Sequence, residues 1–154
     1  MSIEDEVDVL RRIPLFAKVD VSRLKLLAFT SERITFEPGQ ELFRQGDIGD
    51  AAYVIIDGTA EVLVETPTGP VSVATIERNA FVGEIAILCD VPRTATVRAV
   101  DRLDTLKIMK EHFLRLIAEF PDMAIEVMRV LADRLGQTTS ELTQARNRLR
   151  ELGS

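Results

Sequence analysis

Residues 81–97 read FVGEIAILCDVPRTATV, a stretch in which a glycine, a carboxylate, an apolar turn and an arginine follow in close succession. Gly83 lets the backbone approach a ligand where a side chain would collide, and residues 85–88 can wind one helical turn whose free N–H groups face an anion. Arg93 adds a permanent positive charge in a planar fork that matches two phosphate oxygens, whereas the acceptors of Glu84 suit a sugar hydroxyl. The stretch therefore predicts a binding site for a sugar and its phosphate.

Residues 82–97 closely resemble, without a gap, the phosphate-binding cassette of the cyclic nucleotide-binding domain. That family includes bacterial catabolite-activator-type regulators, cyclic nucleotide-dependent kinases and gated channels. The resemblance implies that Glu84 binds the ribose 2′-hydroxyl and Arg93 the cyclic phosphate, assisted by backbone N–H groups near Gly83 and Ala86. The alternative interpretation is a salt bridge between Glu84 and Arg93 across a turn. The implied ligand-binding residues are Val73, Val82, Gly83, Glu84, Ile85, Ala86, Arg93, Thr94, Ala95, Thr138 and Thr139.

The resemblance also implies how the purine base would be held. Val73 and Val82 would form an apolar wall beside the base, and the hydroxyls of Thr138 and Thr139 would meet it from the C-terminal helix. A single threonine is also ordinary in such a helix, so both interpretations of Thr138 stay open. A threonine at the place of Thr94 recurs in domains that take cGMP, but its hydroxyl can instead bind the phosphate, as in bacterial relatives that respond to cAMP. We expect cAMP as the ligand, with cGMP as the alternative, and no cofactor.

One departure from the family precedes the cassette. The family usually carries a Pro-Gly-Asp-like turn at this place, whereas this chain has Arg78-Asn79-Ala80. The resemblance therefore leaves the conformation of this turn open, although it does not affect the ligand contacts that follow.

The composition fits one domain with an extension and argues against several classes of function. The chain has 154 residues, 46% of them hydrophobic, which is enough for one core and too few for two ordinary domains. Its net charge of −6 argues against a broad electrostatic contact with nucleic acid. The single histidine, His112, and the single cysteine, Cys89, offer neither a metal site nor a His-paired nucleophile, so we expect no metal and no enzymatic activity. No apolar run approaches the length of a membrane span, and we expect a cytoplasmic protein.

The pattern of apolar residues predicts a mainly β protein with flanking helices. Helical spacing over residues 3–30, broken at Pro14 and restarted at Asp20 or Ser22, predicts a helical preface. Over residues 34–108, short β-rich runs separated by turn signals predict an antiparallel sandwich or barrel. Together with the resemblance, this predicts a jelly-roll-like antiparallel β-barrel.

A boundary is expected at Pro121. A short helix over residues 111–119 completes the cyclic nucleotide-binding domain, which we assign to residues 1–120. Residues 121–154 are expected to form a long C-terminal helix, which the resemblance places over the ligand as a lid and which we also expect to serve dimerisation.

The C-terminal helix carries a heptad pattern. Apolar residues follow one another at alternating steps of four and three, which is typical of a helix that packs on a partner helix. A single amphipathic helix folded back on its own barrel is the alternative, but it leaves Leu142, Leu149 and Leu152 exposed. We therefore expect a parallel homodimer, with Glu141 and Arg146 at opposing positions. The predicted dimer seam consists of Met128, Leu131, Leu135, Leu142 and Leu149.

The elements that other members of the family add to this domain narrow the expected function. Up to Ser154 the sequence shows no helix-turn-helix, kinase catalytic subunit or pore. We expect a stand-alone cyclic nucleotide receptor that signals through its C-terminal helix or dimer geometry to an unidentified effector protein, without itself binding nucleic acid or membrane. The alternative is the ligand-sensing half of a transcription regulator that lacks its DNA-binding domain.

Overall fold

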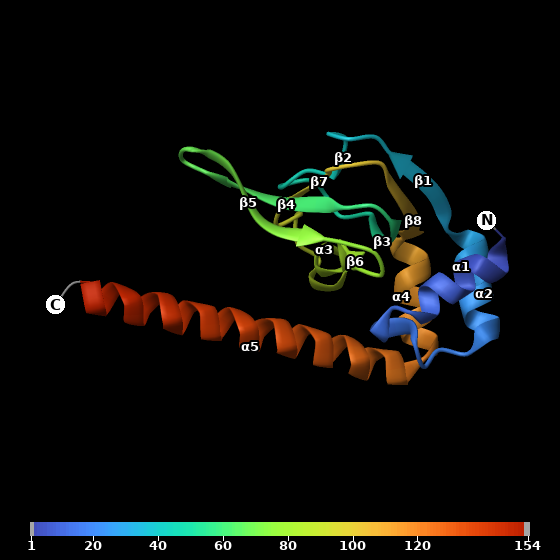
Figure 1. Ribbon diagram of the computed structural model, residues 1–154. Helices are drawn as coiled ribbons and strands as arrows, with labels where there is room; N and C mark the ends of the chain where they lie inside the picture. Colours follow the sequence, from blue (N-terminus) through green and yellow to red (C-terminus); the bar gives the residue numbers. More distant parts are fainter. Residues whose placement is uncertain (1, 153–154) are drawn as a thin grey trace.

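The computed structural model describes residues 2–152, apart from the side chains at positions 134, 135, 137, 138 and 141. Helices lie at both ends of this part of the chain, and all of its strands lie between them in the sequence (Figure 1). None of the described helices combines the length and the apolar character that crossing a membrane requires. The helices are α1 (Ile3–Arg11), the 3₁₀ helix η1 (Pro14–Phe16), α2 (Val21–Thr30), α3 (Glu84–Cys89), α4 (Lys110–Glu119) and α5 (Pro121–Leu152). The strands are β1 (Glu32–Phe36), β2 (Glu41–Phe43), β3 (Ala51–Asp57), β4 (Ala60–Thr66), β5 (Gly69–Ile76), β6 (Phe81–Val82), β7 (Thr96–Ala99) and β8 (Leu103–Met109).

The N-terminal helices begin at residues whose side chains favour those positions. Ser2 caps α1 through a reciprocal capping box with Asp5. Pro14 starts η1, and Asp20 caps α2 by accepting a hydrogen bond from the backbone N–H of Arg23 at 2.9 Å. The break at Pro14 and the restart at Asp20 lie where the sequence predicts them.

The strands form two four-stranded antiparallel sheets, in the orders β1-β8-β3-β6 and β2-β7-β4-β5. Antiparallel sheets with flanking helices confirm the predicted fold class at this level. The expected closed barrel is not formed, because no strand pairing within the described residues joins the two sheets. The physical reason lies at β6, which pairs with β3 over only Phe81 and Val82 before Gly83 turns the chain into α3. β5 and β6 therefore remain edge strands, joined by the turn of residues 77–80.

Two apolar clusters hold the layers together. One lies between the helices and the sheet that contains β3 and β8, and it includes the aromatic trio of Phe16, Phe81 and Phe113. The ring centroids of this trio lie 5.3 to 6.4 Å apart in edge-on geometry. The other cluster lies between the two sheets and includes Tyr53 and Leu103. Because Phe81 comes just before the cassette, the trio ties the position of the cassette to the helices.

Helix α5 packs on the other helices through its first turns. Met123 and Val127 are buried, Leu131 is partly buried, and α5 contacts η1 and α4. Its C-terminal half projects away from the other helices (Figure 1), where Leu142 and Leu149 are 66% and 70% exposed. In this arrangement the apolar face of α5 is covered only near its start.

Candidate ligand-binding site

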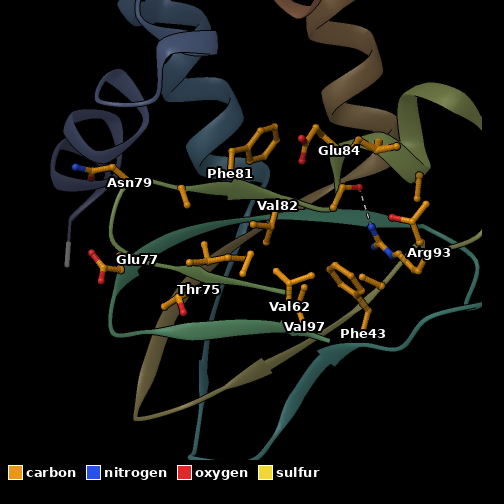
Figure 2. A pocket seen from close by; sticks show the side chains of 18 of the residues that line it. Phe43, Val62, Thr75, Glu77, Asn79, Phe81, Val82, Glu84, Arg93 and Val97 are labelled. Carbon is orange, nitrogen blue, oxygen red and sulfur yellow. Dashed lines mark hydrogen bonds between the residues drawn. The ribbon is translucent and has the colours of Figure 1, made fainter. Parts of the chain in front are cut away.

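A cavity of about 610 Å³ lies between β5, β6 and α3, and Figure 2 shows the side chains around it. Its apolar wall includes Phe43, Val62 and Val97, which come from β2, β4 and β7. A space of this size is typical of sites for small molecules. Most of the predicted ligand-binding residues line it, namely Val82, Gly83, Glu84, Ile85, Ala86, Arg93, Thr94 and Ala95.

Gly83 occupies the left-handed region, with φ 89°, at the point where β6 passes into α3. A Cβ atom at this position would lie 2.6 Å from Arg93 Nη1, and 3.3 Å from both the Ala51 carbonyl oxygen and the Phe43 ring. The torsion angle and the close approach both require glycine. The predicted helical turn after Gly83 is α3, which spans six residues and is followed by Asp90, a second left-handed residue.

The Arg93 side chain is buried at one end of the cavity, with 4% of its surface exposed. Nη1 donates to the Gly83 carbonyl oxygen at 2.7 Å (Figure 2). Nη2 donates to the carbonyl oxygen of Ala51. Among the residues that the structure describes, its buried Nε–H has no acceptor. Burial lowers the pKa of Arg93, while the nearby carboxylate of Asp50 opposes that shift, and a guanidinium stays protonated in such surroundings. The cavity therefore ends at a buried positive charge with an unused donor.

Glu84 is the first residue of α3 and is only 5% exposed. It lines the same cavity as Arg93. An ionised carboxylate offers only acceptors, whereas a guanidinium offers only donors. The cavity thus presents both kinds of group to a molecule that carries a hydroxyl and an anion.

The turn that departs from the family pattern is well ordered by backbone hydrogen bonds. Asn79 adopts a left-handed conformation with φ 71°, which asparagine tolerates better than most residues. Its N–H donates to the Ile55 carbonyl oxygen, and the Ile55 N–H donates to the Ala80 carbonyl oxygen, both at 2.9 Å. The turn closes with a bond from the Ala80 N–H to the Glu77 carbonyl oxygen at 3.2 Å. Asn79 therefore adopts the left-handed conformation that glycines adopt in other turns of this chain.

Two of the predicted residues, Val73 and Thr139, are not among the described residues that line the cavity. Val73 is 58% exposed at an irregularity in the β4–β5 pairing, and its neighbour Ala74 lines the cavity instead. An extra residue in one strand shifts the following side chains, which explains this exchange. Thr139 is exposed on α5, away from the cavity lining, and the side chain of Thr138 lies outside the described residues.

Local sequence carries only a weak signal for the apolar wall. Val62 belongs to an alternating run with Ala60 and Val64, which predicts a buried strand face but not a ligand beside it. Phe43 and Val97 are paired neighbours on β2 and β7, although they lie far apart in the sequence. Such a pair depends on tertiary contacts, which a local pattern does not contain.

A family model described as the cyclic nucleotide-binding domain matches residues 33–120. The chain belongs to the cyclic nucleotide-binding domain family. The match covers more than half of the chain and contains the whole cassette, so the family predicted from the cassette is confirmed.

Similar members of the family include kinase regulatory subunits and transcription regulators. A cAMP-dependent protein kinase regulatory subunit from Mucor circinelloides f. lusitanicus is 41% identical over 97 residues, which cover 63% of this chain and 23% of that protein. The N-terminal domain of a transcriptional regulator from Streptomyces coelicolor A3(2) has a similar structure, with a TM-score of 0.69 and 32% identity over 85% of this chain and 94% of that domain. The catabolite activator protein of Thermus thermophilus has a TM-score of 0.76 and 28% identity, covering 84% of this chain and 61% of that protein. The chain therefore spans about a quarter of the kinase subunit and less than two thirds of the catabolite activator.

Gly83→Ala should lower the free energy of unfolding by about 1 to 3 kcal/mol, because it combines a strained torsion with a collision against Arg93. Urea unfolding followed by circular dichroism measures the loss. Gly39→Ala is the matched control, since Gly39 has φ 87° but an added Cβ there would meet nothing within 4 Å. Equal losses in the two variants would contradict the close approach at Gly83.

Proposed function

We propose that this chain is a cyclic nucleotide receptor, with cAMP as its ligand and cGMP as the alternative. The proposal is carried by the buried guanidinium of Arg93, which borders the cavity and keeps one N–H donor without an acceptor in the described part of the chain. A cyclic phosphate would supply a negative charge and acceptor oxygens at this point, offsetting the cost of burying the arginine. The similarity to a regulatory subunit named as cAMP-dependent supports the choice of cAMP.

The ribose and the base would occupy the remainder of the same cavity. In this proposal Glu84 accepts a hydrogen bond from the ribose 2′-hydroxyl, and backbone N–H groups near Ala86 assist at the phosphate. The base would lie against apolar side chains, among them Val62, Val82 and Ala74, rather than against Val73. The lining of the cavity supports this placement.

We also propose that α5 forms a dimer along its heptad face. Met128, Leu142 and Leu149 are all more than half exposed, so the heptad face is uncovered at these positions, whereas Leu131 is partly buried against the core of its own chain. Burying such side chains against a second helix is favourable. The side chains of Leu135 and Glu141, which the heptad pattern also places near the seam, lie outside the described residues.

We propose that ligand binding is signalled from one part of the chain, residues 1–120, to the other, residues 121–154. The first part binds the nucleotide, and the second acts as lid and dimerisation helix, bringing Thr138 and Thr139 towards the base when it closes. Its new position, or the new dimer geometry, would be recognised by an effector protein in the cytoplasm. The exposed C-terminal half of α5 supports this role, because a partner can reach it.

A second candidate function is the ligand-sensing part of a transcription regulator. It is favoured by the similarity to the Streptomyces coelicolor domain, 94% of which this chain covers at 32% identity. Reading the gene beyond the codon for Ser154 tests this candidate. A helix-turn-helix there would favour the regulator, and a stop codon would favour the receptor that acts through a partner protein.

Arg93→Ala should weaken cAMP binding by roughly 3 kcal/mol or more, because it removes a charge-assisted contact from a buried phosphate. Glu84→Ala should weaken binding less, since the ribose hydroxyl is neutral. Isothermal titration calorimetry measures both. Arg78→Ala is the control, because this exposed arginine also lines the cavity but pairs with Asp57. If both site variants bound cAMP like the parent while staying folded, the assigned site would be wrong.

Thr94→Ala distinguishes the two roles of the Thr94 hydroxyl. If it binds the guanine amino group, the variant should lose about 0.5 to 1.5 kcal/mol for cGMP and little for cAMP. If it binds the phosphate, the affinities for both nucleotides should fall together, and this is the result we expect. Titrating both nucleotides into parent and variant decides between them, with Thr75→Ala on another part of the cavity as the control. A parent that prefers cGMP strongly would contradict the choice of cAMP.

Replacing both Leu142 and Leu149 with Asp should disfavour the dimer, because it places unpaired charges in an apolar interface. Light scattering after size exclusion, with ligand present, reports the mass in solution. The matched control replaces Ser140 and Asn147 with Asp, since these exposed residues have the same spacing on the opposite face of α5. A dimer of modest affinity should form at roughly tens of micromolar protein. If the parent were monomeric at that concentration, the proposed dimer seam would be wrong.

A further inference from the structure

The ring of Phe43 lies under the guanidinium of Arg93. The Cζ atom of Arg93 is 4.0 Å from the centroid of the Phe43 ring, well within the range of a cation–π contact (Figure 2). Phe43 also lines the cavity, so this stacked pair stands at the end of the cavity where the phosphate is proposed to bind. The aromatic ring is thus a candidate for a role in recognition as well as in the core.

The ring is held in place by its own neighbours. Phe43 is the last residue of β2 and pairs with Val97 on β7. Its centroid lies 6.2 Å from that of Tyr53, which is buried and in turn lies 6.0 Å from Phe36. An aromatic side chain fixed in this way presents one ring face to the guanidinium at a constant position.

The hydrogen bonds of Arg93 restrain the guanidinium within its own plane. Nη1 and Nη2 donate to the carbonyl oxygens of Gly83 and Ala51, which lie at the edge of the planar group. A planar group held only at its edge can still tilt about that edge, and stacking opposes such a tilt. The tilt matters because it would turn the unused Nε–H and the other N–H donors of the guanidinium away from a bound phosphate.

We propose that Phe43 is a positioning residue for phosphate recognition: its ring face holds the Arg93 guanidinium in the plane that suits the cyclic phosphate. This role rests on the proposed function, because it concerns the same ligand and the same arginine. Phe43 acts through Arg93, so its contribution should vanish when Arg93 is absent.

Phe43→Leu should weaken cAMP binding roughly five- to thirtyfold, the range that corresponds to a desolvated cation–π contact. Phe43→Tyr keeps the ring and should restore affinity to within about threefold of the parent. The matched control is Phe36→Leu, which removes another phenyl ring that packs on Tyr53. In the described structure the ring stacked on Arg93 is that of Phe43, not that of Phe36. It should bind cAMP like the parent.

A double-mutant cycle shows whether the effect passes through Arg93. In an Arg93→Gln background, Phe43→Leu should cost less than about twofold in cAMP affinity. A second measurement needs no ligand: the Arg93 Nε–H proton resonance should be shifted upfield by the ring, and Phe43→Leu should abolish that shift while Phe36→Leu preserves it.

The outcomes separate this role from the proposed function. If the parent bound cAMP and Phe43→Leu bound it equally well, or lost the same factor with and without Arg93, the positioning role would be overturned and the receptor function would stand. An unshifted Arg93 resonance in the parent would also overturn the role. A parent that bound no cyclic nucleotide would overturn both.

Discussion

Arg93 carries a positive charge that water barely reaches, and much of the surrounding architecture follows from that charge. A buried guanidinium needs acceptors for its donors, and the chain supplies the carbonyl oxygens of Gly83 and Ala51. One of these carbonyls belongs to a residue that must be glycine, because a side chain there would collide with the arginine itself. The ring of Phe43 covers one face of the same group. The two carbonyl acceptors, the glycine and the aromatic ring all serve to accommodate the buried guanidinium. They leave its Nε–H available to an anion in the cavity.

The same residues explain why the two sheets stay separate. The chain leaves β6 after Val82 in order to place Gly83 and α3 beside the arginine, so β6 is too short to pair with β5. The edge strands of the two sheets then border the cavity instead of each other. The two apolar clusters, rather than strand pairing between the sheets, hold the layers together.

A structural feature can be predicted from this sequence when it depends on residues that are close together in the chain. The positions of Gly83, Glu84 and Arg93 around one cavity follow from a continuous stretch whose residue types are each required by backbone geometry or charge. The start of α2 at Asp20 follows from an equally local rule of helix capping. The exchange of Val73 for Ala74 depends on a bulge in the pairing with β4, and the contact of Phe43 with Arg93 depends on strands that meet only in the folded chain. No short-range pattern contains that information.

Helix α5 is held near its start, where Val127 is buried and Leu131 is partly buried, while its apolar face continues towards Leu149. From Leu131 to the end of the helix at Leu152 is roughly 30 Å at the α-helical rise. Because α5 is held near its start, a tilt of roughly 5° there would move its C-terminal end by roughly 3 Å over such a length. Two helices that interlock through side chains accept only certain alignments, so a displacement of this size separates an alignment that fits from one that does not. In the proposed dimer, a change at the cavity too small to alter its shape appreciably would thus become a choice between discrete assemblies at the far end of α5.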